Sequence, residues 1–180
     1  LLYRYFGWES PEFIHLPLIL NEERAKLSKR HGAVSVEEFR ERGYLPQALL
    51  NFIALLGLNP GDDREVLSLE EMVDEFRFER VSKSGAVFDR EKLNWMNQQY
   101  LLKLPEEEYF RMIDDVIQKG DYHDQDPGKI RQAAEILKTR LVTLSDLNQK
   151  LGLFFEENPE IKDLQAIEVL KEENSKTVLK

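Results

Sequence analysis

The stretch GYLPQALLNFIALLG, residues 43–57, decides the fold class of this 180-residue chain. Leu45-Pro46 starts a helix with proline in the first turn, where the missing N–H has no partner to lose. Apolar side chains then cover nearly every face, which is typical of a buried helix; they are Ala48, Leu49, Phe52, Ile53, Leu55 and Leu56. Gly57 and Pro60-Gly61 end the pattern. We therefore expect a core helix around which neighbouring segments pack.

Helix start signals recur on both sides of this core helix. Residues 35–38 and 68–71 each read as a capping box, with a serine that accepts an early N–H and a glutamate that reaches back. Asp89 is expected to cap a further helix, in which Trp95 and Met96 are core residues. Residues 82–86 read as a loop. These elements predict a compact helical unit of about 80 residues.

The second half predicts a small helix bundle. Residues 104–108, LPEEE, read as a domain junction and a helix start, because proline occupies the first turn and three carboxylates favour the positive end of the helix dipole. The apolar stripe of that helix is Tyr109, Met112, Ile113, Val116 and Ile117. Asp126-Pro127 is another start signal. Further helices are expected at 130–141, 144–151 and 161–173.

Residues 1–20 are mainly apolar and predict the rim of an α/β domain. Leu1 to Gly7 reads as the end of a helix. Residues 13–20, FIHLPLIL, favour an edge strand over a helix because the run is short, partly β-branched and interrupted by Pro17. The chain starts without methionine, and we expect it to be an internal fragment of a longer protein.

Composition narrows the classes of protein. The chain has no cysteine, which excludes disulfides and a thiolate zinc site within it. None of its apolar runs approaches the length of roughly 20 residues that is needed to cross a bilayer. A cytosolic protein that does not bind a membrane is therefore expected. The net charge is −9, unlike that of a generally basic nucleic-acid-binding domain. A local cationic patch on an acidic protein can still bind phosphate.

Such a patch occurs directly after the apolar run. Four cations lie within residues 24–30, in a loop that also contains Ser28 and Gly32; the cations are Arg24, Lys26, Lys29 and Arg30. A basic loop of this kind suits a triphosphate, because ammonium groups stabilise charge that shifts over phosphate oxygens during a reaction. The alternative is a solvated charged surface balanced by Glu22 and Glu23.

The loop and its surroundings resemble a known family. KLSKR, residues 26–30, resembles the KMSKS signature of class I aminoacyl-tRNA synthetases, in the form typical of glutamyl-tRNA synthetases. The flanking segments HLPLIL (15–20) and HGAVSV (31–36) resemble the same family, as do GYLPQALLNF (43–52), LLG (55–57), FD (88–89), KL (92–93) and WMN (95–97). The resemblance covers residues 1–103 strongly and continues beyond them only in the layout of helices.

The resemblance implies a mainly α fold in three parts. Residues 1–25 would be the end of a Rossmann-type α/β catalytic domain, and 26–104 the KMSKS loop with an α-helical stem-contact domain. Residues 105–180 would be an incomplete α-helical anticodon-binding bundle. The family's HIGH signature and glutamate pocket are expected upstream, and HLPL at 15–18 is given a structural role. The fragment alone is therefore expected to be inactive.

The implied reaction forms glutamyl-adenylate from glutamate and ATP with Mg²⁺, then transfers glutamate to tRNA(Glu). The resemblance makes Lys26 and Lys29 the catalytic lysines at the ATP phosphates, with Ser28 and Arg30 also binding ATP. No metal site is expected, because the three histidines lack ligand-like spacing. The sequence leaves open whether tRNA(Gln) is also used, and a monomer is expected.

Candidate tRNA contacts lie in both halves. The loop over residues 82–89 is flanked by basic residues, which are Arg80, Lys83, Arg90 and Lys92. An RNA backbone could be fixed there through its phosphates. The alternative is a mixed-charge surface, since acidic residues alternate with them. Arg140 falls near an anticodon-reading arginine of the family, on a helix expected to carry Lys129, Arg131 and Lys138 as well; an exposed helix face is the alternative.

Two other function classes stay open. A non-catalytic tRNA-binding module would use the helical domains alone. A helical protein-interaction domain would carry the basic loop incidentally. Shorter synthetase-like paralogues that modify tRNA lack an anticodon-binding region, and the helices after Pro105 count against them.

Overall fold

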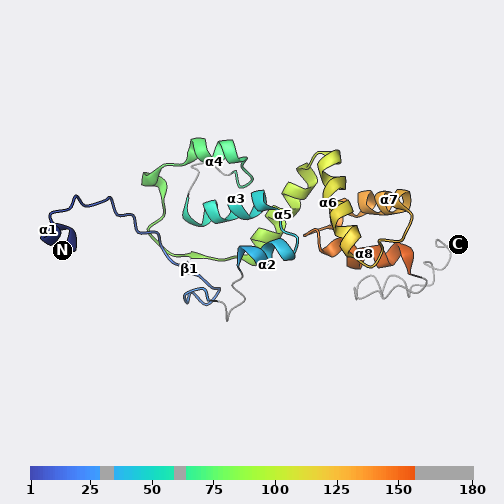
Figure 1. Ribbon diagram of the computed structural model, residues 1–180, viewed down its shortest axis with the longest axis horizontal. Coiled ribbons are helices and arrows are strands. Elements are labelled where there is room, and N and C mark those ends of the chain that lie inside the picture. The colour runs from blue at the N-terminus through green and yellow to red at the C-terminus, as the bar shows by residue number, and fades with distance from the viewer. Residues whose placement is uncertain (29–34, 59–63, 157–180) are drawn as a thin grey trace. The chain divides into compact units, whose positions relative to one another are not determined.

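A computed structural model describes residues 1–28, 35–58 and 64–156 (Figure 1). The described chain is mainly helical, as predicted, and it has one two-stranded sheet. It divides into two compact units. Unit 1 comprises Leu1–Arg40 and Leu45–Tyr100, and unit 2 comprises Glu41–Tyr44 and Leu101–Lys180. Within the described ranges, no helix is long and apolar enough to cross a membrane.

Apart from the first, the helices that begin in unit 1 start where their caps or prolines predict. They are α1 (Leu2–Phe6), α2 (Val36–Glu41), α3 (Pro46–Gly57), α4 (Leu69–Glu75) and α5 (Arg90–Lys103), with the 3₁₀ turn η2 (Phe78–Arg80). Both capping boxes form: the serine hydroxyls accept the N–H groups of Glu38 (3.3 Å) and Glu71 (3.2 Å), and each glutamate accepts the serine N–H in return. Asp89 accepts the Lys92 N–H at 2.9 Å. The local start signals are therefore confirmed.

The core of unit 1 is one-sided around α3 and α5. Phe52 of α3, and Leu93 and Met96 of α5, are buried. The expectation that α3 is buried nearly all round is wrong, because Leu50 and Ile53 are 45% and 44% exposed. The core role expected for Trp95 is also wrong, since its side chain is 42% exposed. The buried positions of α5 follow a three-to-four-residue spacing through 93, 96, 97 and 101, and residue 95 falls on another face.

Two buried asparagines tie chain segments to the helices of unit 1. The Asn97 side-chain oxygen accepts the N–H of Leu45 at 2.8 Å. The Asn51 side-chain oxygen accepts the N–H of Leu67 and the hydroxyl of Tyr100, both at 2.9 Å. Burial and the nearby Glu71 carboxylate raise the pKa of Tyr100 to about 12. These side chains satisfy backbone groups that would otherwise be buried without partners.

The sheet of unit 1 consists of β1 (Ile19–Leu20) and β2 (Ala86–Val87), paired in parallel with Ile19 opposite Ala86. The strand expected over 13–20 is therefore much shorter than predicted, because residues before 19 have no ladder partner in the described part. The two strands approach closely at Gly85. A Cβ there would lie 2.9 Å from the Leu18 carbonyl oxygen and 2.9 Å from a Leu20 methyl carbon.

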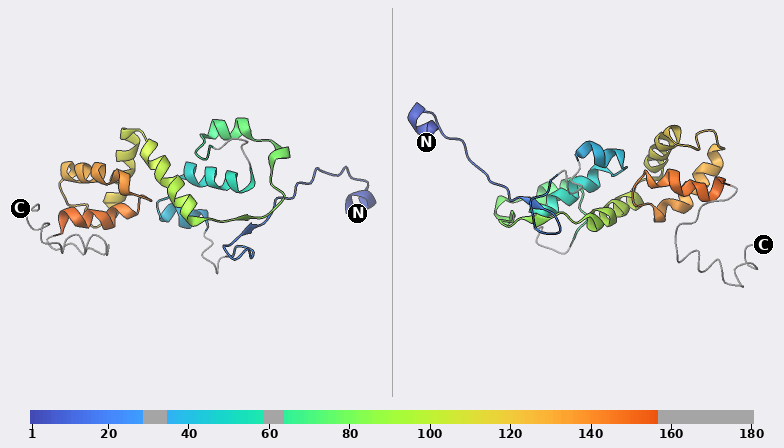
Figure 2. Two further views of the ribbon diagram at one scale, coloured as in Figure 1. Left: turned by 180° about the vertical axis from the view of Figure 1, so that it is seen from behind. Right: turned by 90° about the horizontal axis from the view of Figure 1, so that it is seen from below.

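Unit 2 is a small bundle of α6 (Glu106–Lys119), α7 (Pro127–Leu137) and α8 (Asp146–Phe155), with the 3₁₀ turn η3 (Lys138–Arg140). Helix α8 packs against α7 and α6, and Figure 2 shows α7 beside α8 from two directions. Asp126 caps α7 by accepting the Lys129 N–H at 2.8 Å, as its sequence predicts. The helix expected over 130–141 instead tightens at Lys138, and the one expected over 161–173 lies outside the described residues.

Tyr109 and Gly43 hold unit 2 together at two places. The Tyr109 side chain is 1% exposed, and its hydroxyl donates to the Ala134 carbonyl at 2.7 Å. Burial raises the pKa of Tyr109 to about 12. Gly43 adopts φ 77°, and its carbonyl accepts the N–H of Leu144 at 3.0 Å. The Ser145 hydroxyl donates to the Arg42 carbonyl at 2.6 Å, so the segment after α2 is bonded to the start of α8.

Candidate nucleotide and RNA interface

The chain reverses tightly after β1, at the base of the basic loop. The buried Asn21 closes this turn: its side-chain oxygen accepts the Ala25 N–H at 2.7 Å, and its own N–H donates to the Ala25 carbonyl at 2.8 Å. Arg24 adopts φ 60°, a left-handed conformation that costs a non-glycine residue about 1–2 kcal/mol. The turn is thus held by main-chain and asparagine hydrogen bonds, which compensate for this strain.

The first residues of the signature are fixed to the strand. Lys26 forms an antiparallel bridge with Leu20, and the Leu27 N–H donates to the Ile19 carbonyl at 2.9 Å. β1 therefore has β2 on one edge and residues 26–27 on the other. The Lys26 side chain is exposed, whereas Ser28 is half-buried. Lys29 and Arg30, the other two predicted ATP-binding residues, lie outside the described residues.

A cavity of about 730 Å³ opens beside the carboxyl ends of β1 and β2. Ligands of α/β folds often bind at that edge of a parallel sheet. Its lining combines apolar side chains with carboxylates; it consists of Phe52, Leu55, Leu56, Ala86, Val87, Glu22, Asp89, Glu91 and Lys92. The ammonium of Lys92 is paired with Glu65, outside this lining. Three carboxylates on the rim disfavour a phosphate there, so the cavity does not suit a triphosphate.

The predicted RNA-contact residues of unit 1 lie close in sequence but have different surroundings. Arg80 ends η2 and forms an ion pair with Glu75 at 3.0 Å. The Arg90 guanidinium lies 6.0 Å from the centre of the Phe88 ring, at the edge of cation–π range. Lys83 is exposed on the loop between η2 and β2, and no ion pair joins it to another residue of the described part. Lys83 is therefore the most accessible of the three.

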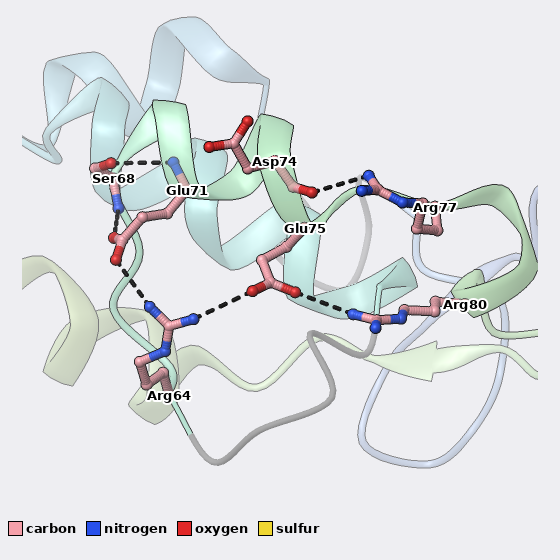
Figure 3. Close-up of polar contacts among 7 residues, drawn as sticks. All are labelled: Arg64, Ser68, Glu71, Asp74, Glu75, Arg77 and Arg80. Atoms are coloured by element: carbon pink, nitrogen blue, oxygen red, sulfur yellow. Dashed lines mark hydrogen bonds and ion pairs between the residues drawn. The ribbon is translucent and has the colours of Figure 1, made fainter.

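Arg80 belongs to a larger charge network on α4, drawn in Figure 3. Arg64 pairs with Glu71 at 2.8 Å and with Glu75 at 3.2 Å. The two glutamates are four residues apart, so they share one face of α4. The sequence alone does not single out Arg64 or Glu75. The sequence signal is the four-residue spacing of Glu71 and Glu75, which lie between Arg64 and Arg80 in the chain.

In unit 2 the predicted anticodon residue Arg140 is exposed. It lies in η3, so the expectation that it shares one α-helix with Lys129, Arg131 and Lys138 is wrong. Lys138 donates to the Leu104 carbonyl at 3.2 Å and its ammonium lies 4.7 Å from the centre of the Tyr109 ring. Arg131 pairs with Asp114 at 3.5 Å. Lys138 and Arg131 thus contribute to packing within the bundle.

Metal ligands do not gather anywhere in residues 1–28, 35–58 and 64–156. No group of three or more histidine, cysteine, aspartate or glutamate side chains in those ranges has an arrangement that could hold a metal ion.

Comparisons with family models divide the chain into two matches. Residues 1–95 match the model "tRNA synthetases class I (E and Q), catalytic domain". Residues 93–180 match the model "Anticodon binding domain". The order of the two matches is the order predicted from the sequence. The boundaries predicted at residues 25 and 104 are finer than these two matches and stay predictions.

Individual relatives carry consistent names. The chain is 46% identical over 158 residues to glutamate–tRNA ligase 1 of Syntrophomonas wolfei, covering 87% of this chain and 32% of the relative. It is 44% identical over 182 residues to glutamate–tRNA ligase 2 of Syntrophus aciditrophicus, covering 100% of this chain and 37% of the relative. The chain thus spans about a third of the length of these curated relatives.

Solved structures agree with the sequence matches. A crystal structure of a glutamate tRNA ligase from Elizabethkingia meningosepticum superposes with a TM-score of 0.74 at 32% identity, covering 99% of this chain and 39% of that one. Glutamate-tRNA synthetase from Elizabethkingia anophelis gives the same TM-score at 34% identity, covering 93% of this chain and 37% of that one. The fold described above is therefore that of a segment of such enzymes.

Proposed function

This chain belongs to the class I tRNA synthetases of the glutamate and glutamine branch, and we propose that it supplies the ATP-phosphate loop and tRNA contacts of a glutamate–tRNA ligase. The protein would activate glutamate with ATP and transfer it to tRNA(Glu). One observation carries the proposal: KLSKR at 26–30 follows directly on β1, in a chain whose two halves match a catalytic and an anticodon-binding model.

The loop would act electrostatically on the triphosphate. Lys26 and Lys29 would stabilise negative charge as it shifts during adenylate formation, while Ser28 and Arg30 would hold phosphate oxygens by hydrogen bonds. Removing one such donor typically lowers a rate by about 10²–10³. The bridge between Lys26 and Leu20 supports this role because it fixes the start of the loop at the sheet. Mg²⁺ would accompany ATP as a phosphate counterion.

The tRNA contacts would be divided between the units. Lys83, Arg80 and Arg90 would bind phosphates of the tRNA stem, where contacts set position and not sequence. Arg140 would contact the anticodon, because exposed arginines bind unstacked bases by stacking and hydrogen bonds. Whether tRNA(Gln) is a second substrate depends on that anticodon contact.

The same membership supports the remaining assignments. A monomeric, cytoplasmic enzyme is proposed, and residues 1–180 alone are expected not to aminoacylate because they span about a third of the curated relatives. A second candidate is a non-catalytic tRNA-binding module. It is favoured by one observation, the anticodon-binding match over residues 93–180, which by itself requires no catalysis.

Aminoacylation of total tRNA by the whole protein distinguishes the two candidates. Each of the amino acids would be offered with ATP, and the charged tRNA identified by hybridisation. We expect ATP-dependent transfer of glutamate to tRNA(Glu). Tight tRNA binding with no charging of any amino acid would refute the ligase proposal and support the module.

A further inference from the structure

Glu75 lies between two arginines that come from opposite sides of α4 in the sequence. One carboxylate oxygen of Glu75 is 3.2 Å from Arg64, and the other is 3.0 Å from Arg80. Figure 3 shows the carboxylate between the two guanidinium groups. The arginine side chains are 47% and 46% exposed, whereas Glu75 is 28% exposed. The guanidiniums thus remain accessible to a ligand from solvent while Glu75 is the more covered partner.

The arrangement around Glu75 is held by a helix cap. Glu71 closes the capping box with Ser68 and also binds Arg64 at 2.8 Å. Arg64 is therefore held by carboxylates from two successive turns of α4. The two arginines and two glutamates sum to zero charge, so the cluster attracts a phosphate less than either arginine alone would.

Carboxylate and phosphate oxygens compete for the same guanidinium donors. Arginine binds both groups through parallel N–H bonds of similar geometry. Arg80 also lies three residues before the exposed Lys83, so one short segment carries both the cation that pairs with Glu75 and the exposed cation. An arriving phosphate has to share or displace the Glu75 carboxylate.

We propose that Glu75 is a built-in counterion that weakens the hold of Arg64 and Arg80 on tRNA phosphates and so sets the strength of stem binding. This proposal rests on the tRNA-binding part of the proposed function. A carboxylate in this position reduces binding to RNA of any sequence, since phosphate contacts carry no sequence information. It also favours release of charged tRNA at the end of each turnover, a step that limits many enzymes.

Two isosteric variants of the whole protein test this role. Glu75→Gln removes the carboxylate between the arginines. Asp74→Asn makes the same change in net charge at the neighbouring residue. Among the described residues, the guanidinium that bonds to Asp74 is that of Arg77, and it donates to the backbone oxygen at 2.8 Å. Fluorescence anisotropy with labelled tRNA(Glu), measured over a range of salt concentrations, gives the affinity and its salt dependence.

We expect Glu75→Gln to bind tRNA about fivefold more tightly at low salt, with a salt slope steeper by about 0.9, as for one added phosphate contact. Asp74→Asn should stay within about twofold of wild type, because its charge change is long-range and screened. In an Arg64→Gln/Arg80→Gln background, Glu75→Gln should bring no further gain, because both guanidinium groups that pair with Glu75 are then absent.

The result that overturns the proposal is equal affinity of Glu75→Gln and Asp74→Asn, or a gain from Glu75→Gln that survives in the Arg64→Gln/Arg80→Gln background. Lys83→Ala shows whether such a result concerns Glu75 alone or the proposed function as well. If wild type binds tRNA and Lys83→Ala weakens the binding, the tRNA interface stands without a role for Glu75. If wild type shows no saturable tRNA binding, both are refuted. Circular dichroism checks folding, and Glu75→Ala repeats the comparison should Glu75→Gln fail to fold.

Discussion

Gly43→Ala should destabilise unit 2 through two separate effects. The position has φ 77°, in the left-handed region that costs alanine about 1–2 kcal/mol. The new Cβ would also lie 2.6 Å from the Ser145 nitrogen and 2.8 Å from the Leu144 nitrogen. Both are backbone atoms, and Leu144 is itself bonded to the Gly43 carbonyl, so neither can move without breaking a contact.

The two effects give a magnitude. Overpacking of this kind typically costs about 1–3 kcal/mol. Added to the conformational cost, it predicts a loss of about 2–5 kcal/mol in the free energy of unfolding. For a unit of this size each kcal/mol lowers Tm by about 4–8 °C, so a drop of about 10 °C or more is expected.

Differential scanning calorimetry of three variants checks this reasoning. Gly85→Ala has the close contact without a left-handed φ, and should cost about 1–3 kcal/mol in unit 1. Gly57→Ala meets nothing within 4 Å and should stabilise α3 by about 0.5–1 kcal/mol. Fluorescence of Trp8 and Trp95, both in unit 1, shows which transition moves. A Gly43→Ala protein within about 0.5 kcal/mol of wild type would refute the argument, because that is the range of neutral surface changes.

Three further predictions concern buried polar groups and the RNA surface. The free energy of unfolding should fall by on the order of 2 kcal/mol between pH 10 and 12 through Tyr109, because the unfolded tyrosine ionises near its ordinary pKa while the folded one stays neutral up to a pKa of about 12. Urea unfolding of Tyr109→Phe should lack this part of the alkaline loss. An equal loss in wild type and Tyr109→Phe would contradict the prediction. Asn51→Ala should cost about 2–4 kcal/mol by urea unfolding, since it leaves the buried Leu67 N–H without an acceptor; a cost below about 1 kcal/mol would not fit. Lys83→Ala should lower the salt slope of tRNA binding by about 0.9. Lys119→Ala, the same change at an exposed lysine, should leave the slope as in wild type. Equal slopes for the two variants would count against a phosphate contact at residue 83.

Local features of the fold are predictable from the sequence. The caps at Ser35, Ser68, Asp89 and Asp126 act over three residues, so their sequence patterns contain the whole interaction. The proline starts and the glycine stop at residue 7 are equally local. Long-range contacts are not predictable in this way. The length of β1 depends on where β2 pairs with it, more than sixty residues later in the chain.

The candidate site shows the same division. KLSKR is recognisable because it is contiguous, whereas the turn that positions it depends on the buried Asn21 and on Arg24 in a left-handed conformation. The basic residues are visible in the sequence, but their availability is not. Within the described residues, Arg80 is paired with a glutamate on α4 and Lys83 has no ion pair, and the folded arrangement is what distinguishes them.

The rate of tRNA(Glu) charging by a Lys29→Ala variant of the whole protein tests the central claim most directly. If residues 26–30 bind the ATP phosphates during glutamate activation, this rate should fall by about 10² or more at saturating substrates. Tm and circular dichroism should match those of wild type, and Lys119→Ala, the same change on α6, should charge normally. A Lys29→Ala protein that charges tRNA(Glu) as fast as Lys119→Ala would contradict the assignment of the loop.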